Sequence, residues 1–262
     1  MFMLSQMSQW VVAHGSEAIT FMLVFARAAG LILGAPYWGS KMVPAPVRIW
    51  ITLVLAIATY PLVQMVSLPG GFTLVSMTLA LVGEIFLGLV LGWVAQLLFA
   101  GMRLAGQAIE SRSGLGFVQL VDPHEGGSTG IFSAFLEVLA GLVFFALNGH
   151  HLLIHALTAS YSVFPLAGDK FTARLLEGVI TSGGQIFAIG LRVSAPVVIG
   201  LLLTDVVLGV LSRAIPQMNI FMVAAPLQFG VAMILLMLSL PVLAKFFERQ
   251  LPLMIGVPGG GG

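Results

Sequence analysis

Long hydrophobic stretches separated by short polar segments dominate the pattern of this 262-residue chain. About six of them approach or exceed the roughly 20 apolar residues that a helix needs to cross a bilayer. They are Ala18–Ala35, Ile49–Ser67, Met77–Ala100, Ile131–Phe164, Ile186–Leu211 and Ile220–Phe246. The fourth stretch is interrupted at Asn148-Gly149-His150-His151, which predicts one span, a turn and a further half-helix. Because the alternating segments of a membrane β-barrel are missing from the sequence, the chain is predicted to be all-α.

Turn-forming residues mark several ends of these stretches. The first stretch ends at Gly34-Ala35-Pro36, and helices normally stop before a proline. Ser67-Leu68-Pro69-Gly70-Gly71 and Pro165-Leu166-Ala167-Gly168-Asp169 predict turns. Inside the stretches, prolines such as Pro196 and the small-residue pattern Gly88-x-x-x-Gly92 favour kinked helices in close contact. We therefore expect a polytopic membrane protein of kinked helical hairpins.

Composition supports the membrane assignment and excludes several classes of function. Charged residues make up 8% of the chain and hydrophobic ones 59%, whereas soluble domains carry about 25% charged residues. The net charge of +1 gives no basic face for nucleic acid. The chain has no cysteine, which excludes disulfides and thiolate sites, and it shows no catalytic motif. We expect a non-enzymatic protein without a cofactor, forming one domain over residues 1–256 with a flexible glycine-rich tail at 257–262.

The distribution of lysine and arginine between the stretches predicts the orientation of the first half only. Lys41 and Arg48 follow the first stretch, and Arg103 and Arg112 follow the third, which favours an N-terminus outside the cytoplasm. In the second half, positive residues fall on successive sides of the predicted spans. Six straight lipid-facing spans are therefore poorly supported, and the topology of the second half stays open.

Ionisable residues within or at the ends of apolar helices are the first candidate site. Such groups normally face protein, a cavity or a partner charge. They are Arg27, Glu84, Arg103, Glu137, Arg192, Asp205 and Arg213. One interpretation is a proton or ion relay of a transporter; the other is pairing with each other or with neighbouring subunits, which fixes helix packing. Packing is favoured, because no two acidic residues recur at relay spacing on one helix. His151 and His155 have the spacing of a helical metal pair, but a packing role is favoured there too.

The longest connection, from Gly106 to Ser128, is the second candidate site. Gly114 and Gly116 flank a leucine and permit unusual backbone angles, and Asp122-Pro123 predicts a turn. Bulky residues such as Phe117 argue against disorder. The segment is either an interfacial helix or a loop that folds into a protein-lined cavity, where irregular backbone is tolerated.

An ordered set of short motifs over most of the chain resembles the FliR family, which includes the SpaR/YscT-type subunits of virulence injectisomes. The matching residues are Arg27-Ala28-Ala29-Gly30 with Pro36; Val43-Pro44-Ala45-Pro46-Val47-Arg48; Glu84 with Gly88, Gly92 and Gln96; Arg103 with Gly106-Gln107; Gly114-Leu115-Gly116-Phe117 with Asp122-Pro123; Asn148-Gly149-His150; Pro196; Asp205 with Gly209, Arg213, Pro216-Gln217, Asn219 and Phe221; and Pro226.

The resemblance implies a subunit of the flagellar type III protein-export gate, located in the bacterial inner membrane at the flagellar basal body. Family members resemble a FliP-like part fused to a FliQ-like part within a helical ring. Expected partners are FliP-like, FliQ-like and FlhB-like subunits in a membrane-associated hetero-oligomer, with exported flagellar proteins as transient substrates. An injectisome subunit, an ion or small-molecule transporter and an intramembrane enzyme remain the alternatives, and Asn148-Gly149-His150 favours the flagellar branch.

The resemblance also assigns the segment from Gly106 to Asp122 to the family's channel plug. The residues expected to form it are Gly106, Gly114, Leu115, Gly116, Phe117, Val118, Asp122 and Pro123. A bulky apolar side chain on a glycine-hinged loop can exclude water and ions and still move aside. We therefore expect Phe117 to seal the channel.

Overall fold

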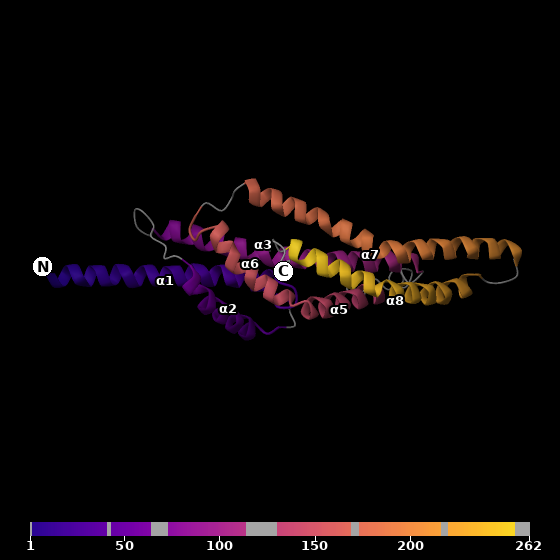
Figure 1. Ribbon diagram of the computed structural model, residues 1–262, viewed down its shortest axis with the longest axis horizontal. Helices are drawn as coiled ribbons and strands as arrows, with labels where there is room; N and C mark the ends of the chain where they lie inside the picture. Colours follow the sequence, from indigo (N-terminus) through magenta and orange to yellow (C-terminus); the bar gives the residue numbers. More distant parts are fainter. Residues whose placement is uncertain are drawn as a thin grey trace. The chain divides into compact units, whose positions relative to one another are not determined.

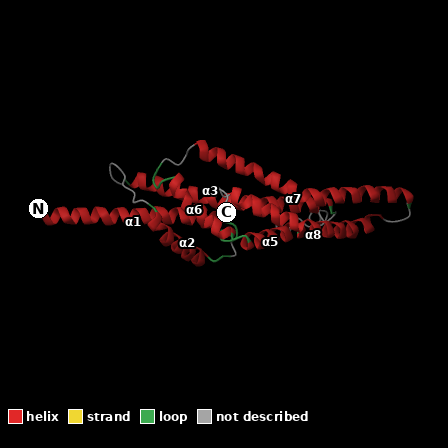
Figure 2. Cartoon of the chain, viewed as in Figure 1, coloured by secondary structure: helices red, strands yellow, loops and turns green. Residues whose placement is uncertain are grey.

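The computed structural model describes residues 2–40, 43–63, 73–113, 130–168, 173–215 and 220–254. Helices are the only regular elements within these ranges (Figures 1 and 2). They are α1 (Phe2–Gly34), α2 (Ala45–Thr59), the short 3₁₀ helix η1 (Tyr60–Leu62), α3 (Leu74–Arg112), α5 (Ile131–Ala146), α6 (Gly149–Val163), α7 (Ala173–Ala214) and α8 (Ile220–Met254). The all-α prediction is confirmed. The likeness to a FliP-like/FliQ-like fusion stays a prediction.

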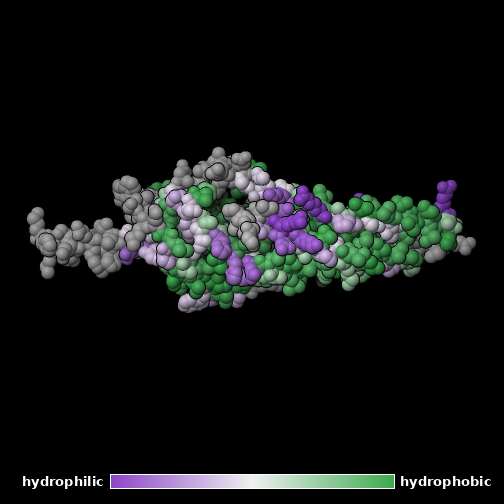
Figure 3. Space-filling view, viewed as in Figure 1, coloured by the Kyte–Doolittle hydropathy of each residue, from purple (hydrophilic) through white to green (hydrophobic). Residues whose placement is uncertain are grey.

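Several of these helices are long and apolar enough to cross a membrane. Five qualify in the described part of the chain: Gly15–Gly34, Ala45–Leu62, Leu74–Arg112, Gly178–Ala214 and Met222–Pro252. Helices α5 and α6, separated by a break at Leu147-Asn148, qualify together as a sixth. Large hydrophobic side chains are exposed along these helices, and hydrophobic residues cover much of the face seen in Figure 3. Such a surface needs lipid or protein against it, and the chain is a membrane protein.

Two helices extend further than their hydrophobic stretches predicted. α1 starts at Phe2 rather than near Ala18. α3 ends at Arg112, so the first part of the connection expected from Gly106 onward is helical. The reason is periodicity: Ala105, Gly106 and Ile109 are buried, whereas Gln107 is exposed and Ala108 is partly exposed, as on an amphipathic helix. The connection to α5 therefore begins only after Ser113.

Two breaks next to α6 contain a residue with a positive φ, in the left-handed backbone region. Asn148, between α5 and α6, has φ 55°, and Ala167, after α6, has φ 56°. Asparagine tolerates this region better than most residues, which gives a physical reason for the polar break at Asn148-Gly149. The predicted turn at Pro165–Gly168 is present, with the Gly168 N–H donating to the Pro165 carbonyl at 3.2 Å. The turn predicted at 67–71 lies outside the described residues.

The chain divides into two compact units, and α3 runs from one into the other. The first contains Met1–Gln96, His150–Thr181 and Pro252–Gly262, and the second contains Leu97–Gly149 and Ser182–Leu251. Each unit is described by itself below. The expectation of a single domain over residues 1–256 stays a prediction.

In the first unit, α1 and α3 approach so closely that only glycine fits at their contact. A Cβ atom added to Gly30 would lie 2.2 Å from the Ile85 carbonyl oxygen, and one added to Gly88 would lie 2.1 Å from that of Arg27. One turn further, the same contact is made by Gly34 and Gly92. The contacts advance in the same direction along both helices, so α1 and α3 run parallel. The close approach predicted from Gly88-x-x-x-Gly92 is confirmed, with a second glycine pair as its partner.

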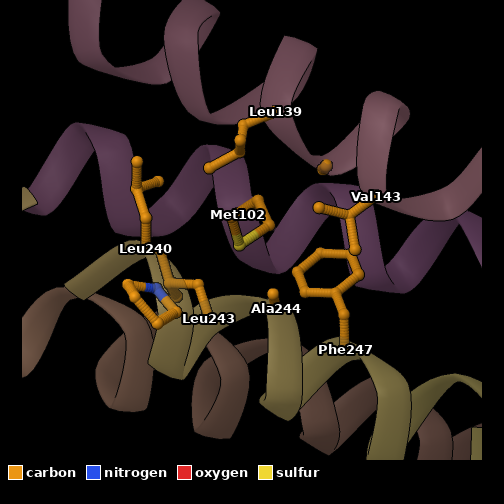
Figure 4. A pocket seen from close by; sticks show the side chains of 9 residues that line it. Met102, Leu139, Val143, Leu240, Leu243, Ala244 and Phe247 are labelled. Atoms are coloured by element: carbon orange, nitrogen blue, oxygen red, sulfur yellow. The ribbon is translucent and has the colours of Figure 1, made fainter. Parts of the chain in front are cut away.

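In the second unit, the end of α3 packs against α5, α7 and α8. A Cβ added to Gly101 would collide with Ile189 of α7, and one added to Gly106 would lie 2.4 Å from Ser133 Cα of α5. Met102 of α3 lies beside an apolar pocket of about 300 Å³ that α5 and α8 also line (Figure 4). Its lining residues are Met102, Leu139, Ala140, Val143, Leu240, Pro241, Leu243, Ala244 and Phe247.

Candidate functional site

Arg27 and Glu84 form a fully buried ion pair between α1 and α3 in the first unit. The Arg27 Nε donates to Glu84 Oε2 at 2.6 Å, and both side chains are 0% exposed. The two residues lie one turn before the glycines of the helix contact, so the close approach of the backbones brings their side chains together. A buried ion pair is tolerated only when its remaining hydrogen-bonding groups also find partners.

Those remaining groups bond to α6 and to the turn after it. Arg27 Nη1 donates to the Ser160 hydroxyl at 3.0 Å, and Nη2 donates to the Phe164 carbonyl at 2.9 Å. The guanidinium carbon lies 4.4 Å from the centre of the Tyr161 ring, which adds a cation–π contact. One arginine therefore connects α1 to both α3 and α6.

Glu84 holds the turn that follows α6. Its second oxygen, Oε1, accepts the backbone N–H of Ala167 at 3.2 Å. Ala167 has a left-handed φ of 56°, which is unfavourable for an L-residue with a Cβ atom. The hydrogen bond to a buried carboxylate helps to hold this backbone in place. Because neither charged group reaches the surface of the chain, the arrangement supports packing and offers no exposed proton carrier.

A second buried carboxylate, Glu110, lies near the end of α3 in the second unit. Its side chain accepts the backbone N–H groups of Phe132 at 2.8 Å and Ser133 at 3.2 Å, and the Ser133 hydroxyl at 3.1 Å. These N–H groups belong to the first turn of α5, where helices leave backbone donors without internal partners. Glu110 thus caps α5 from another helix, in the favourable field of the α5 N-terminus.

Small residues make this cap possible. A Cβ added to Gly130, the residue before α5, would lie 2.0 Å from the Glu110 carboxylate. Gly106, one turn before Glu110, contacts the Ser133 backbone. The same contacts set the distance between Ser113 and Gly130, the two described residues that bound segment 114–129. The Glu110 cap therefore fixes both ends of the longest connection in the chain.

The other charges predicted in the helices lie in the second unit and have local partners or none. Arg103 donates to Glu137 at 2.8 Å, and their side chains are 47% and 34% exposed. The Gln228 amide donates to the Asp205 carboxylate. Arg192 and Arg213 are exposed and form no hydrogen bond or ion pair with any residue in the described ranges. Each carboxylate thus has its own separate partner.

Comparison with known proteins identifies the family. The family model described as bacterial export proteins, family 1, matches residues 18–254. The chain belongs to this family. It is 32% identical over 228 residues to the flagellar biosynthetic protein FliR of Caulobacter vibrioides, covering 87% of this chain and 91% of the relative. It is 31% identical to FliR of Escherichia coli, covering 85% of each chain. The surface presentation of antigens protein SpaR of Salmonella typhimurium is 28% identical, covering 82% of this chain and 81% of the relative.

The resemblance to the FliR family, carried by short motifs in the sequence, is thereby confirmed. Within this export protein, the residues expected to form the plug fall largely outside the described residues. These are Gly114, Leu115, Gly116, Phe117, Val118, Asp122 and Pro123. Gly106, the first residue of the predicted plug segment, lies inside α3 against Ser133 of α5. The plug assignment stays a prediction.

Glu110 is the residue that sequence reasoning missed in this family member. It lies four residues after Gly106 and one after Ile109, all on the buried face of α3. Extending the helical period of Ala105 and Ile109 past residue 106 would have placed Glu110 on that face. No group of three metal-binding side chains occurs in the described part of the chain, which includes His151 and His155.

Proposed function

We propose that this chain is the FliR-type subunit of a flagellar type III protein-export gate in the bacterial inner membrane. The match of residues 18–254 to a family of export proteins, with flagellar relatives aligned over most of their length, carries the proposal. The subunit acts without catalysis and without a cofactor. It joins FliP-like, FliQ-like and FlhB-like subunits in the basal body and borders the channel for unfolded flagellar proteins.

The surface of the chain supports a role within an assembly. Large apolar side chains project along α7 and α8, and many are more than half exposed. They include Phe187, Leu191, Leu203, Val206, Val210, Met222, Met237, Leu238 and Val242. A helix apolar on its outer face packs against lipid or against neighbouring protein. Helices of partner subunits would cover the part of this surface that lipid does not reach.

Co-expression tests this proposal directly. The chain is produced with and without FliP-like and FliQ-like subunits from the same organism, and each sample is extracted in mild detergent and sized. We expect the three proteins to elute together as a larger assembly. A stable, monodisperse monomer that leaves both partners unbound would contradict the proposal.

Plugging by the segment between α3 and α5 is the finer part of the proposal. Its support is the family resemblance together with the chemistry of a bulky apolar residue between flexible glycines. We expect Phe117→Ala to raise ion leakage through the assembled gate, because removing the ring opens a path for water. The matched control is Phe187→Ala, which removes an equal side chain from the exposed face of α7. Equal conductance of the two variants would refute sealing by Phe117.

An injectisome subunit is the second candidate function, because SpaR of Salmonella typhimurium aligns over 82% of this chain. The FliR proteins of Caulobacter vibrioides and Escherichia coli favour the flagellar assignment, since they align over greater lengths than SpaR and with higher identity. Complementation separates the two functions. Restored swimming in a strain that lacks its FliR subunit supports the flagellar gate, whereas restored injectisome secretion alone supports the alternative.

A further inference from the structure

The outer face of α7 is apolar over the length of a bilayer and has an arginine at each end. Arg192 and Arg213 are both exposed, and every exposed residue between them is apolar. The 20 residues 193–212 extend about 30 Å as a helix, which equals the thickness of the hydrocarbon core of a bilayer. Arg192 continues, at helical spacing, a row of exposed apolar side chains formed by Ile199, Leu203, Val206 and Val210.

α8 shows the same change from apolar to cationic. Its exposed residues within 222–244 are all apolar, and the next exposed ones are Lys245, Glu248 and Arg249. Lys245 and Arg249 continue a row of exposed apolar side chains formed by Leu227, Ile234 and Leu238. Hydrophobic residues cover the part of this hairpin that is seen at the right end of Figure 3.

Two contacts show how α7 and α8 pair. The Gln228 amide donates to the Asp205 carboxylate, and a Cβ added to Gly200 would lie 2.1 Å from the Leu235 side chain. Positions further back on α7 thus pair with positions further along α8, so the helices are antiparallel. Asp205 is the one ionisable residue in 193–212 and 222–244, and its hydrogen bond directs the carboxylate toward α8.

This pairing brings the cationic ends of the two rows to the same height. Arg192 lies eight residues before Gly200 and therefore pairs with α8 about eight residues after Leu235. Lys245 is ten residues after Leu235, so the first cations of the two rows differ in height by only about 3 Å. Arg249 lies one turn further along α8. The antiparallel packing of the hairpin thus gathers three cations at one end of its apolar surface.

We propose that the outer face of the α7–α8 hairpin lies against lipid and that Arg192, Lys245 and Arg249, the cationic rim, bind the phosphate groups of anionic phospholipids. Long cationic side chains at the end of an apolar helix reach toward the headgroups, whereas the same charge within hydrocarbon is costly. Both arginine and lysine bind phosphate oxygens. Glu248 is the one acidic residue in 245–249, which leaves the rim positive. This contact requires only that the chain is a membrane protein, whichever assembly it joins.

Length and charge favour lipid over a neighbouring subunit on this face. A lipid contact must match the thickness of the hydrocarbon core, and the apolar length between Arg192 and Arg213 does so, whereas a protein contact needs no particular length. A neighbouring helix would also give no reason for cations at one height on both α7 and α8. Phe187 and Leu191, exposed beyond the rim, form a separate row on another side of α7 and remain available to neighbouring subunits.

Fluorescence quenching by lipid tests the contact, because the chain has no cysteine of its own. Leu203→Cys and Leu238→Cys are labelled with a small fluorophore. Phe187→Cys is the matched control, since Phe187 is 65% exposed and Leu203 is 63% exposed. Each variant is purified with its co-expressed partner subunits and reconstituted into discs of phosphatidylethanolamine and phosphatidylglycerol, with or without brominated acyl chains. We expect brominated lipid to quench both outer-face labels strongly and the label at position 187 little.

Lipid selectivity tests the cationic rim. Arg192→Gln/Lys245→Gln removes one rim cation from each helix, and Arg103→Gln/Arg112→Gln removes the same charge from α3. Each variant is taken from discs of phosphatidylglycerol and phosphatidylcholine, and native mass spectrometry counts the lipids that stay bound. We expect the ratio of bound phosphatidylglycerol to phosphatidylcholine to fall about fivefold for each rim cation removed and to change little in the α3 variant. An equal fall in both variants would overturn phosphate binding by the rim.

Co-purification of the partner subunits is measured in every sample. If the partners are present but Leu203→Cys and Leu238→Cys are quenched no more than Phe187→Cys, neighbouring subunits cover this face. The lipid contact is then overturned, while the export-gate proposal stands. If no partner co-purifies with the parent chain, the export-gate proposal fails, and quenching in the chain alone still decides the lipid contact.

Discussion

Two buried carboxylates on the same helix, Glu84 and Glu110, are stabilised in different ways. Glu84 is 0% exposed and is matched by an equally buried arginine. Glu110 is 5% exposed, and no lysine, arginine or histidine in the described ranges forms an ion pair with it. Its partners are two backbone N–H groups and one hydroxyl at the start of α5.

The two sites therefore differ in what a substitution can remove from them. The Glu84 site depends on a second side chain, so changing Arg27 leaves a charge behind in the interior. The Glu110 site depends mainly on two backbone N–H groups, which only a proline at position 132 or 133 would remove. The arginine of an ion pair can bond to several helices at once. A helix cap bonds to the backbone at the end of one helix.

The largest effect is expected from separating the ion pair. Arg27→Met leaves Glu84 buried without its cation and should lower the free energy of unfolding by about 3–5 kcal/mol. The double variant Arg27→Met/Glu84→Leu removes both charges and should be more stable than either single variant. Thermal unfolding in detergent measures all three. A double variant as unstable as the sum of the singles would show that the charges do not act as a pair.

A smaller loss is expected at the helix cap. Glu110→Ala leaves the Phe132 and Ser133 N–H groups without their acceptor and should cost about 2–3 kcal/mol. Glu110→Gln keeps an acceptor oxygen and should lose about 1 kcal/mol. Amide hydrogen exchange measures this loss directly. We expect faster exchange at the first turn of α5 in Glu110→Ala. Unchanged protection of Phe132 and Ser133 in Glu110→Ala would argue against the cap.

The glycine contact near Glu84 is expected to tolerate no methyl group. Gly88→Ala would place a Cβ 2.1 Å from the Arg27 carbonyl oxygen, and separating the two helices should cost about 1–3 kcal/mol. Gly209→Ala is the matched control, because nothing lies within 4 Å of its added Cβ. It should be neutral or stabilising by up to about 1 kcal/mol. Equal unfolding temperatures for the two variants would contradict the close contact.

The smallest effect is expected in the turn that Glu84 holds. Ala167→Gly relieves a left-handed backbone and should stabilise by less than about 1 kcal/mol, since glycine also has more freedom when unfolded. Ala159→Gly, at an exposed position of α6, should instead destabilise by about 1 kcal/mol. Unfolding temperatures that move in the same direction for both variants would show that φ at Ala167 is not strained.

The sequence by itself determined the helical class, most of the candidate spans and the family. These follow from local information: the length of an apolar stretch, a glycine or proline at its end, and short motifs in a fixed order. The stop of α1 at Gly34 and the turn at Pro165–Gly168 were predictable for the same reason. The expected single domain, the plug and the partner subunits remain predictions.

Tertiary structure alone decided which charges meet. Arg27 and Glu84 are 57 residues apart, and only the parallel contact of α1 and α3 at their glycines pairs them. Glu110 belongs to the polar run Glu110-Ser111-Arg112, which by itself predicts the start of a loop. Its burial depends on the neighbouring start of α5 and on glycines at 106 and 130. Local pattern predicts which stretches of the chain are helical, but the partner of a buried charge is set by packing between distant segments.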